Sequence, residues 1–148
     1  MEWQSTITDN DIGVLTFDEE MNWYTVIMNT GHGNVEVSLG CDDFENQSDL
    51  LKDLKGFCFN LNSILDSALH EFVKDLLPLK NEDWLSSSES IYTESSFLKR
   101  VKSSKISISM SEGGLAEIFF DDHGLFADHS MVVWHEEDGV VSGSHLAG

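Results

Sequence analysis

The residues best suited to chemistry lie close together near the C-terminal end of the chain. Residues 121–129 read DDHGLFADH, and this stretch contains no Lys or Arg. Carboxylates and imidazoles are side chains that bind Zn²⁺, Mn²⁺ or Fe²⁺. One hypothesis is therefore a metal-binding protein or metal-dependent enzyme whose ligands would be Asp121, Asp122, His123, Asp128 and His129.

The spacing of the histidines argues against a metal site. His135 and His145 could join the set only if their strands pair, and the four C-terminal histidines follow one another at intervals that match no known ligand motif. The chain also has no HExxH or CxxC sequence. In the simpler interpretation, the aspartates at 121 and 122 form a turn with Gly124, and Asp128 and His129 hydrogen-bond to backbone groups.

Sequence signals for other catalytic chemistry are missing. Ser130 follows His129 but lies in no GxSxG motif, and neither Cys41 nor Cys58 has a basic neighbour in the sequence. The Gly-rich loops that hold phosphates are also absent. The sequence thus favours a protein that is not an enzyme, and no cofactor is expected.

Length and composition predict one domain in the cytoplasm. A chain of 148 residues can bury a hydrophobic core, and none of its apolar runs approaches the roughly 20 residues that span a bilayer. The first residues do not resemble a signal peptide. The two cysteines form no CxxC pair, so we expect free thiols in a reducing compartment.

The net charge of −19 is unevenly distributed along the chain. All eight basic residues lie between Lys52 and Lys105, where eight acidic residues balance them. Residues 1–51 carry eleven acidic residues and residues 106–148 carry eight, with no base in either flank. Such a charge repels nucleic-acid phosphates and anionic lipids, so we expect neither nucleic acid nor membrane as a partner. A basic protein, a cation or simple solubility remain as explanations.

Both flanks have the pattern of β-strands. Strands are expected within residues 13–39, where Val35, Val37 and Leu39 alternate with polar residues, and again within residues 105–147. Short loops between the strands favour antiparallel pairing.

The middle of the chain has a helical pattern. Apolar residues recur every three or four positions, which predicts helices over about 48–77 and 94–102. Ser48 is the expected N-cap of the first helix and Thr93 or Ser95 that of the second, and Pro78 should end the first. Gly56 or residues 60–63 could divide the first helix in two. The order of elements predicts a single α+β domain over 1–148, with an antiparallel sheet packed on a central helical segment.

Four short stretches of the β flanks carry a resemblance to known proteins: LFADHSMVV at 125–133, LAG at 146–148, GVLTFD at 13–18 and NWY at 22–24. They resemble a family of uncharacterised bacterial proteins, Domain of Unknown Function twenty-two sixty-two. Asp128 stands where the family usually has Gly before the histidine. The resemblance implies a small bacterial cytoplasmic α+β protein and brings no activity with it. A looser similarity of architecture and charge links the chain to small acidic immunity proteins, which neutralise toxins.

The sequence therefore favours a non-enzymatic protein-binding domain, and a toxin-neutralising immunity protein is one form of it. The acidic side of the sheet would bind a basic protein partner, with aromatic residues such as Trp3, Tyr24, Trp84 and Trp134 as possible contacts. The alternative is the metal site in residues 121–129. The sequence leaves the oligomeric state open.

Overall fold

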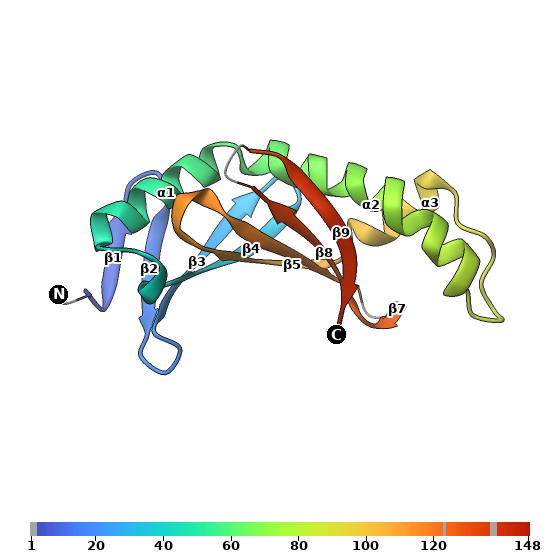
Figure 1. The fold of residues 1–148 in the computed structure, drawn as a ribbon, viewed down its shortest axis with the longest axis horizontal. Coiled ribbons are helices and arrows are strands. Elements are labelled where there is room, and N and C mark those ends of the chain that lie inside the picture. The colour runs from blue at the N-terminus through green and yellow to red at the C-terminus, as the bar shows by residue number, and fades with distance from the viewer. Residues whose placement is uncertain (1–2, 123, 137–138) are drawn as a thin grey trace.

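A single β-sheet forms the framework of the molecule (Figure 1). The computed structural model describes residues 3–122, 124–136 and 139–148. Eight strands pair in the order β1-β2-β3-β4-β5-β6-β8-β9. Their bounds are β1 Thr6–Asp9, β2 Gly13–Asp18, β3 Trp23–Thr30, β4 Gly33–Gly40, β5 Lys105–Met110, β6 Ala116–Asp121, β8 Ser130–His135 and β9 Val141–Ala147. The short β7 (Leu125–Asp128) lies outside this sheet, and a single bridge joins Gly124 to Ala127.

The two flanks of the chain meet in the middle of the sheet. All neighbouring strands are antiparallel except β4 and β5, which run parallel with Val37 opposite Ile108. The chain leaves β4, crosses one face of the sheet as helices and returns beside β4 in the same direction. The α+β prediction is confirmed, and this one parallel pair corrects its all-antiparallel sheet.

Alternation of side chains decides which face of each strand is buried. Val35, Val37 and Leu39 of β4 are fully buried, whereas Glu36 between them is exposed. Strand β1 precedes the first predicted strand. Its sequence, TITD, contains one apolar residue, Ile7, which is too little for an alternating pattern to be recognised.

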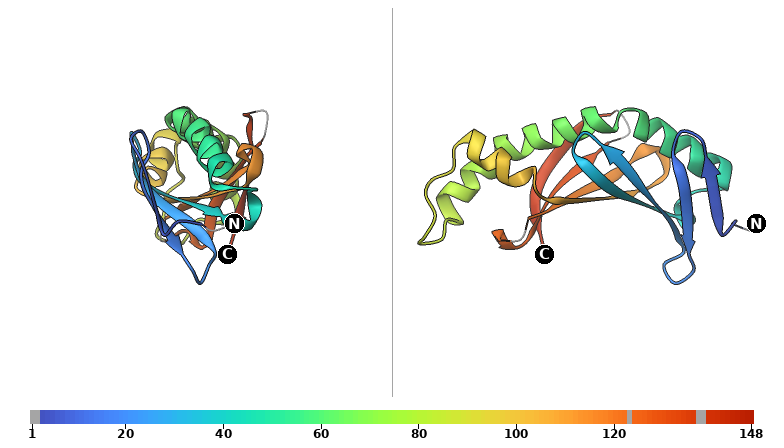
Figure 2. Two further views of the ribbon diagram at one scale, coloured as in Figure 1. Left: turned by 90° about the vertical axis from the view of Figure 1, so that its left-hand side faces the viewer. Right: turned by 180° about the vertical axis from the view of Figure 1, so that it is seen from behind.

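Three helices cover the buried face of the twisted sheet (Figure 2). They are α1 (Gln47–Phe59), α2 (Leu61–Asp83) and α3 (Glu94–Val101). The predicted first helix is indeed divided, at Asn60. Its cap is Asn46 rather than Ser48, because the Asn46 side chain accepts a hydrogen bond from the Asp49 backbone N–H at 2.8 Å. Thr93 caps α3, as predicted.

The prediction that Pro78 ends the helix is wrong, because α2 continues to Asp83. Proline removes one backbone hydrogen bond and crowds the carbonyl group of Lys74. Both residues lie on the exposed side of the helix, where water can bind that carbonyl. Burial of Leu76 and Lys80 on the opposite side holds the helix in place.

Side chains from both flanks and from all three helices form one hydrophobic core. Phe72 of α2 packs edge-on against Phe120 of β6, with ring centroids 5.0 Å apart. In the parts of the chain that the structure describes, no helix has the length and apolar content needed to cross a bilayer.

A buried lysine fastens the segment between α2 and α3 to the body of the protein. Lys80 is 1% exposed, and its Nζ donates to Glu89 Oε1 at 2.9 Å and to the Trp84 carbonyl at 2.8 Å. Glu89 also accepts hydrogen bonds from the Ser86 backbone N–H and from the Tyr92 hydroxyl. A buried ammonium is tolerated only when it is paired in this way.

Replacing Pro78 with alanine should stabilise the protein. Pro78→Ala restores a backbone hydrogen bond inside α2 at an exposed position. We expect the free energy of unfolding to rise by about 1 to 2 kcal/mol. Alanine stabilises the folded helix by more free energy than is lost through the larger conformational entropy of the unfolded chain. Urea unfolding followed by circular dichroism measures the change. A lower midpoint in the variant would show that the proline ring itself packs favourably.

Loss of the Glu89 carboxylate should destabilise the protein in a pH-dependent way. The hydrogen bond from Lys80, followed by those from Ser86 and Tyr92, lowers the pKa of Glu89 from 4.5 to about 2. A depressed pKa contributes stability above the unfolded-state pKa, and this contribution is lost as the pH falls from 4.5 towards 2.

We therefore expect Glu89→Gln to lower the free energy of unfolding by about 2 kcal/mol at neutral pH. The difference in the free energy of unfolding between Glu89→Gln and wild type should become smaller as the pH falls towards 2. Urea unfolding at neutral pH and near the pKa of Glu89 tests this. The exposed Glu82→Gln change is the matched control and should follow wild type throughout. A difference that stays constant with pH would contradict the ionic role of Glu89.

Candidate functional site

The helices leave the other face of the sheet, its outer face, uncovered (Figures 1 and 2). Cross-strand partners place two adjacent rows of side chains on this face. The first row is Thr25, Ser38, Ser109, Glu117 and Trp134, and the second is Ile27, Glu36, Ser107, Phe119 and Val132, of which Val132 is fully buried. The face is therefore a broad surface with hydroxyls, carboxylates and a few large apolar groups.

Two neighbouring loops form an acidic rim beside this face. The turn after β2 contributes Asp18, Glu19 and Glu20, and the segment after β4 contributes Asp42, Asp43 and Glu45, all six exposed. The loops lie together because the Cys41 backbone N–H donates to the Asn22 carbonyl at 2.9 Å. Among the described residues, no Lys or Arg forms an ion pair with these six carboxylates.

The basic residues lie elsewhere. Lys105 begins β5, and the other seven belong to the three helices or to the C-cap of α3. Lys55 of α1 pairs with the turn after β1, where its Nζ lies 3.3 Å from Asp9 Oδ2 and 3.5 Å from Asp11 Oδ2. Acidic groups near the helical layer are thus partly neutralised, whereas the acidic rim is not.

Exposed apolar side chains accompany the acidic rim. Val14 and Ile27 on the outer face are 53% and 57% exposed, and Met21 within the rim is 53% exposed. Sequence reasoning did not single out these residues or Glu36 and Glu117. The signal was present, because each is the outward member of an alternating strand, apart from Met21 in its turn.

The predicted metal ligands form hydrogen bonds and ion pairs of their own. Asp121, at the end of β6, accepts a hydrogen bond from the Ser130 hydroxyl. The side chain of Asp122 is 5% exposed, and its Oδ2 lies 2.8 Å from Arg100 Nε. The hydrogen bond to Asp122 raises the pKa of Arg100 above its ordinary value. The Asp122 carboxylate is therefore already neutralised by a protein cation.

The described C-terminal histidines point their Nδ1 atoms at backbone carbonyls. These contacts are 3.2 Å for His129 to Phe126, 2.7 Å for His135 to Gly114 and 2.8 Å for His145 to Gly143. A carbonyl only accepts, so Nδ1 carries the proton and Nε2 alone could bind a metal. Each ring also packs on an aromatic side chain from another part of the chain.

The described part of the chain contains no group of three or more His, Cys, Asp or Glu side chains arranged to hold a metal ion. Asp128 is exposed at the end of β7. His123 lies outside the described residues, so the predicted metal set stays a prediction.

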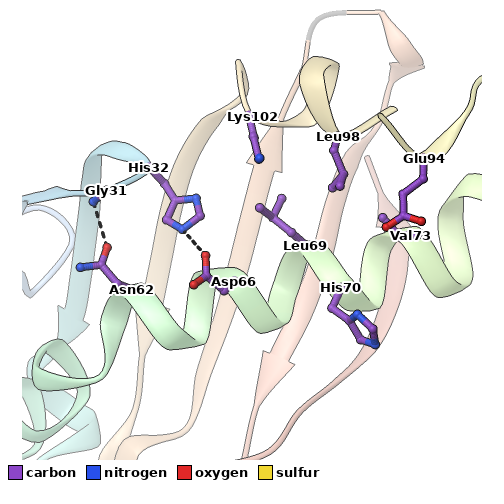
Figure 3. Close-up of a pocket in the computed structure, with 10 residues that line it drawn as sticks. All are labelled: Gly31, His32, Asn62, Asp66, Leu69, His70, Val73, Glu94, Leu98 and Lys102. Carbon is purple, nitrogen blue, oxygen red and sulfur yellow. Dashed lines mark hydrogen bonds and ion pairs between the residues drawn. The ribbon is translucent and has the colours of Figure 1, made fainter. Parts of the chain in front are cut away.

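A cavity of about 620 Å³ lies between α2, α3 and the turn from β3 to β4 (Figure 3). Leu69, Val73 and Leu98 supply its apolar wall, and His32 Nε2 lies 2.9 Å from Asp66 Oδ1 at one end. Figure 3 shows the His70 ring turned away from this space. The lining includes no Ser, Thr or Cys that the His–Asp pair could activate, so it lacks the nucleophile of a catalytic triad.

The cysteines are poorly suited to nucleophilic chemistry. Burial raises the pKa of the Cys58 thiol to about 11 and raises that of the Cys41 thiol above its ordinary value. Both thiols therefore stay protonated at neutral pH, and the thiolate is the reactive form.

The family model described as "Uncharacterized protein conserved in bacteria (DUF2262)" matches residues 9–146. The match covers both β flanks and the helices between them, so the resemblance inferred from the sequence is confirmed. No curated protein and no solved structure shows a significant match to the chain.

His129 should stabilise the fold rather than bind metal. His129→Ala removes the ring packed 5.2 Å from Trp84 and the contact with the Phe126 carbonyl. We expect a loss of about 1 to 2 kcal/mol in the free energy of unfolding, the same with or without added Zn²⁺. Asp128→Asn, at an exposed carboxylate, is the control. A melting temperature that Zn²⁺ raises in wild type but not in His129→Ala would instead support the metal site.

Proposed function

The chain belongs to the uncharacterised bacterial family DUF2262, and we propose that it serves as a non-enzymatic protein-binding domain. Its partner would be a basic protein that binds the acidic rim and the adjoining outer face of the sheet. The observation that carries this proposal is the separation of charge. No Lys or Arg in the described part of the chain pairs with the six exposed carboxylates of the rim, and seven of the eight basic residues lie in the helices or at the C-cap of α3.

Charge complementarity explains why the partner should be basic. An uncompensated acidic surface attracts cationic proteins over several ångströms and speeds their association. The same field repels nucleic acids and anionic membranes. Pairing the rim with Lys or Arg side chains of a partner would also relieve the mutual repulsion of its carboxylates.

The apolar groups on the same surface would contribute the short-range part of binding. Protein interfaces combine a desolvated apolar centre with a polar border. Val14 and Ile27 are exposed in the neighbouring strands β2 and β3, and Ile27 lies beside Glu36, its partner across β3 and β4. A broad sheet face of this kind suits a protein, whereas small molecules usually bind in concave pockets.

A toxin-neutralising immunity protein is the more specific form of this proposal. A toxin that acts on nucleic acid must carry a basic surface to bind phosphates. An acidic protein bound to that surface would block access to the substrate. If this form is correct, the partner is encoded beside the gene for this chain, and co-expression of the two proteins restores growth that the toxin alone prevents.

The acidic rim can be tested with a charge-matched pair of variants. The rim variant combines Asp18→Asn, Glu19→Gln and Glu20→Gln, and the control combines Glu82→Gln, Asp83→Asn and Glu94→Gln in the helical layer. Both remove three exposed carboxylates. Partners captured from bacterial extract at low salt are identified, purified and measured by calorimetry.

We expect one basic protein to bind wild type and the control equally and to bind the rim variant on the order of 10- to 100-fold more weakly. Raising the salt concentration should weaken the wild-type complex as well. Equal affinity of the two variants, or an affinity that salt does not change, would overturn the proposed surface.

A further inference from the structure

A cavity of about 180 Å³ opens on the outer face of the sheet. It lies at the end of the sheet that contains the connection from β5 to β6 and the C-terminal end of β8. Its lining includes two carboxylates, one indole and two hydroxyls, from Glu117, Glu136, Trp134, Ser109 and Ser111. We infer that this cavity holds a single cationic side chain of a protein partner, with arginine the best fit. The inference rests on the proposed function and adds a recognition site to the acidic surface.

The indole wall of the cavity is held in place from one side. The Trp134 ring stacks on His145, with centroids 5.9 Å apart and an angle of 18° between the planes. The Cδ1 edge of the ring also lies close to Gly143, where a Cβ would come within 2.8 Å of Trp134 Cδ1. Gly143 has φ of +71°, so glycine is required there for two reasons. The ring is thus fixed in position before any ligand arrives.

The cavity lies on the other side of β8 from Gly143 and His145, which belong to β9. Neither Gly143 nor His145 lines the cavity, whereas Glu117 lines it and is the cross-strand partner of Trp134. Glu117 is half-buried, and no Lys or Arg of the described chain forms an ion pair with it or with Glu136. The cavity therefore combines an available aromatic face with carboxylates that lack a counter-charge.

These features select the chemical class of the ligand. Carboxylates exclude anions, and a cation over an aromatic face is attracted by the ring as well as by the acids. A guanidinium is planar, so it can stack on the indole while its N–H groups donate to carboxylates at its edge, which a lysine ammonium cannot do. The volume is below the roughly 300 Å³ at which small-molecule pockets begin, which suits one side chain better than a free metabolite.

The test uses a partner-free probe, N-acetyl-arginine amide, followed through the indole N–H signal of Trp134 in NMR spectra. Trp134→Phe identifies that signal by its disappearance. We expect saturable shifts with the arginine probe, weaker shifts with N-acetyl-lysine amide, and none with N-acetyl-citrulline amide, which has the same shape without the charge. Equal shifts with citrulline would overturn the inference, since they would mark a neutral ligand site.

Variants separate this cavity from the acidic rim. Glu117→Gln should weaken the arginine probe and the basic partner by about tenfold, the loss expected for one charge-assisted contact. Glu112→Gln removes a carboxylate from the neighbouring turn, outside the lining, and should match wild type. If the rim variant loses the partner while Glu117→Gln keeps both ligands, the inference fails and the proposed function stands. If the probe binds but no salt-sensitive basic partner exists, the proposed function fails.

Discussion

The parallel pairing of β4 with β5 is the constraint on which the rest of the structure depends. Two parallel neighbours cannot be joined by a tight turn, so the chain between them must cross a face of the sheet. All three helices lie within that crossing, and they therefore cover the same face. The opposite face is left without a helical layer. The position of the exposed surface follows from one strand pairing.

The same crossing gives the charge distribution its three-dimensional form. Because the acidic flanks supply the strands and the balanced middle supplies the helices, the sequence pattern becomes a difference between two layers. Ion pairs sharpen this difference. Lys55, Lys80 and Arg100 each bind carboxylates within or beside the helical layer, whereas no Lys or Arg that the structure describes pairs with the rim or with Glu117. The carboxylates of such a surface repel one another, which destabilises the folded protein. A bound cationic protein would reduce this repulsion.

Local sequence patterns predict most of the helices and strands, but they do not predict contacts between residues far apart in the chain. Alternation placed Val35 and Val37 in the core, and the helical spacing located α1 and α2, because both signals repeat within a few residues. Local patterns do not show that α2 continues past Pro78, because the helix tolerates proline only on its exposed side, and tertiary packing defines that side.

The candidate sites depended still more on contacts distant in sequence. Asp122 has the chemistry of a metal ligand, but it pairs with Arg100, which lies twenty-two positions earlier in the chain. The cavity at Trp134 is lined by residues of β5, β6 and β8. No local sequence motif indicates that residues so far apart in the chain lie together. The separation of charge along the chain can be read from the sequence alone, because it does not depend on which strands pair.

Four described side chains have pKa values that are shifted away from neutral pH. General acid–base catalysis needs groups whose pKa lies near the working pH. In this protein the pKa values of these four side chains move away from neutral pH. The pKa of Glu89 falls to about 2, that of Cys58 rises to about 11, and those of Tyr24 and Tyr92 also rise. Each shift fixes the charge that the group already has at neutral pH. Each of these four groups therefore keeps one charge state near neutral pH, and none of them is poised there to give up or take a proton.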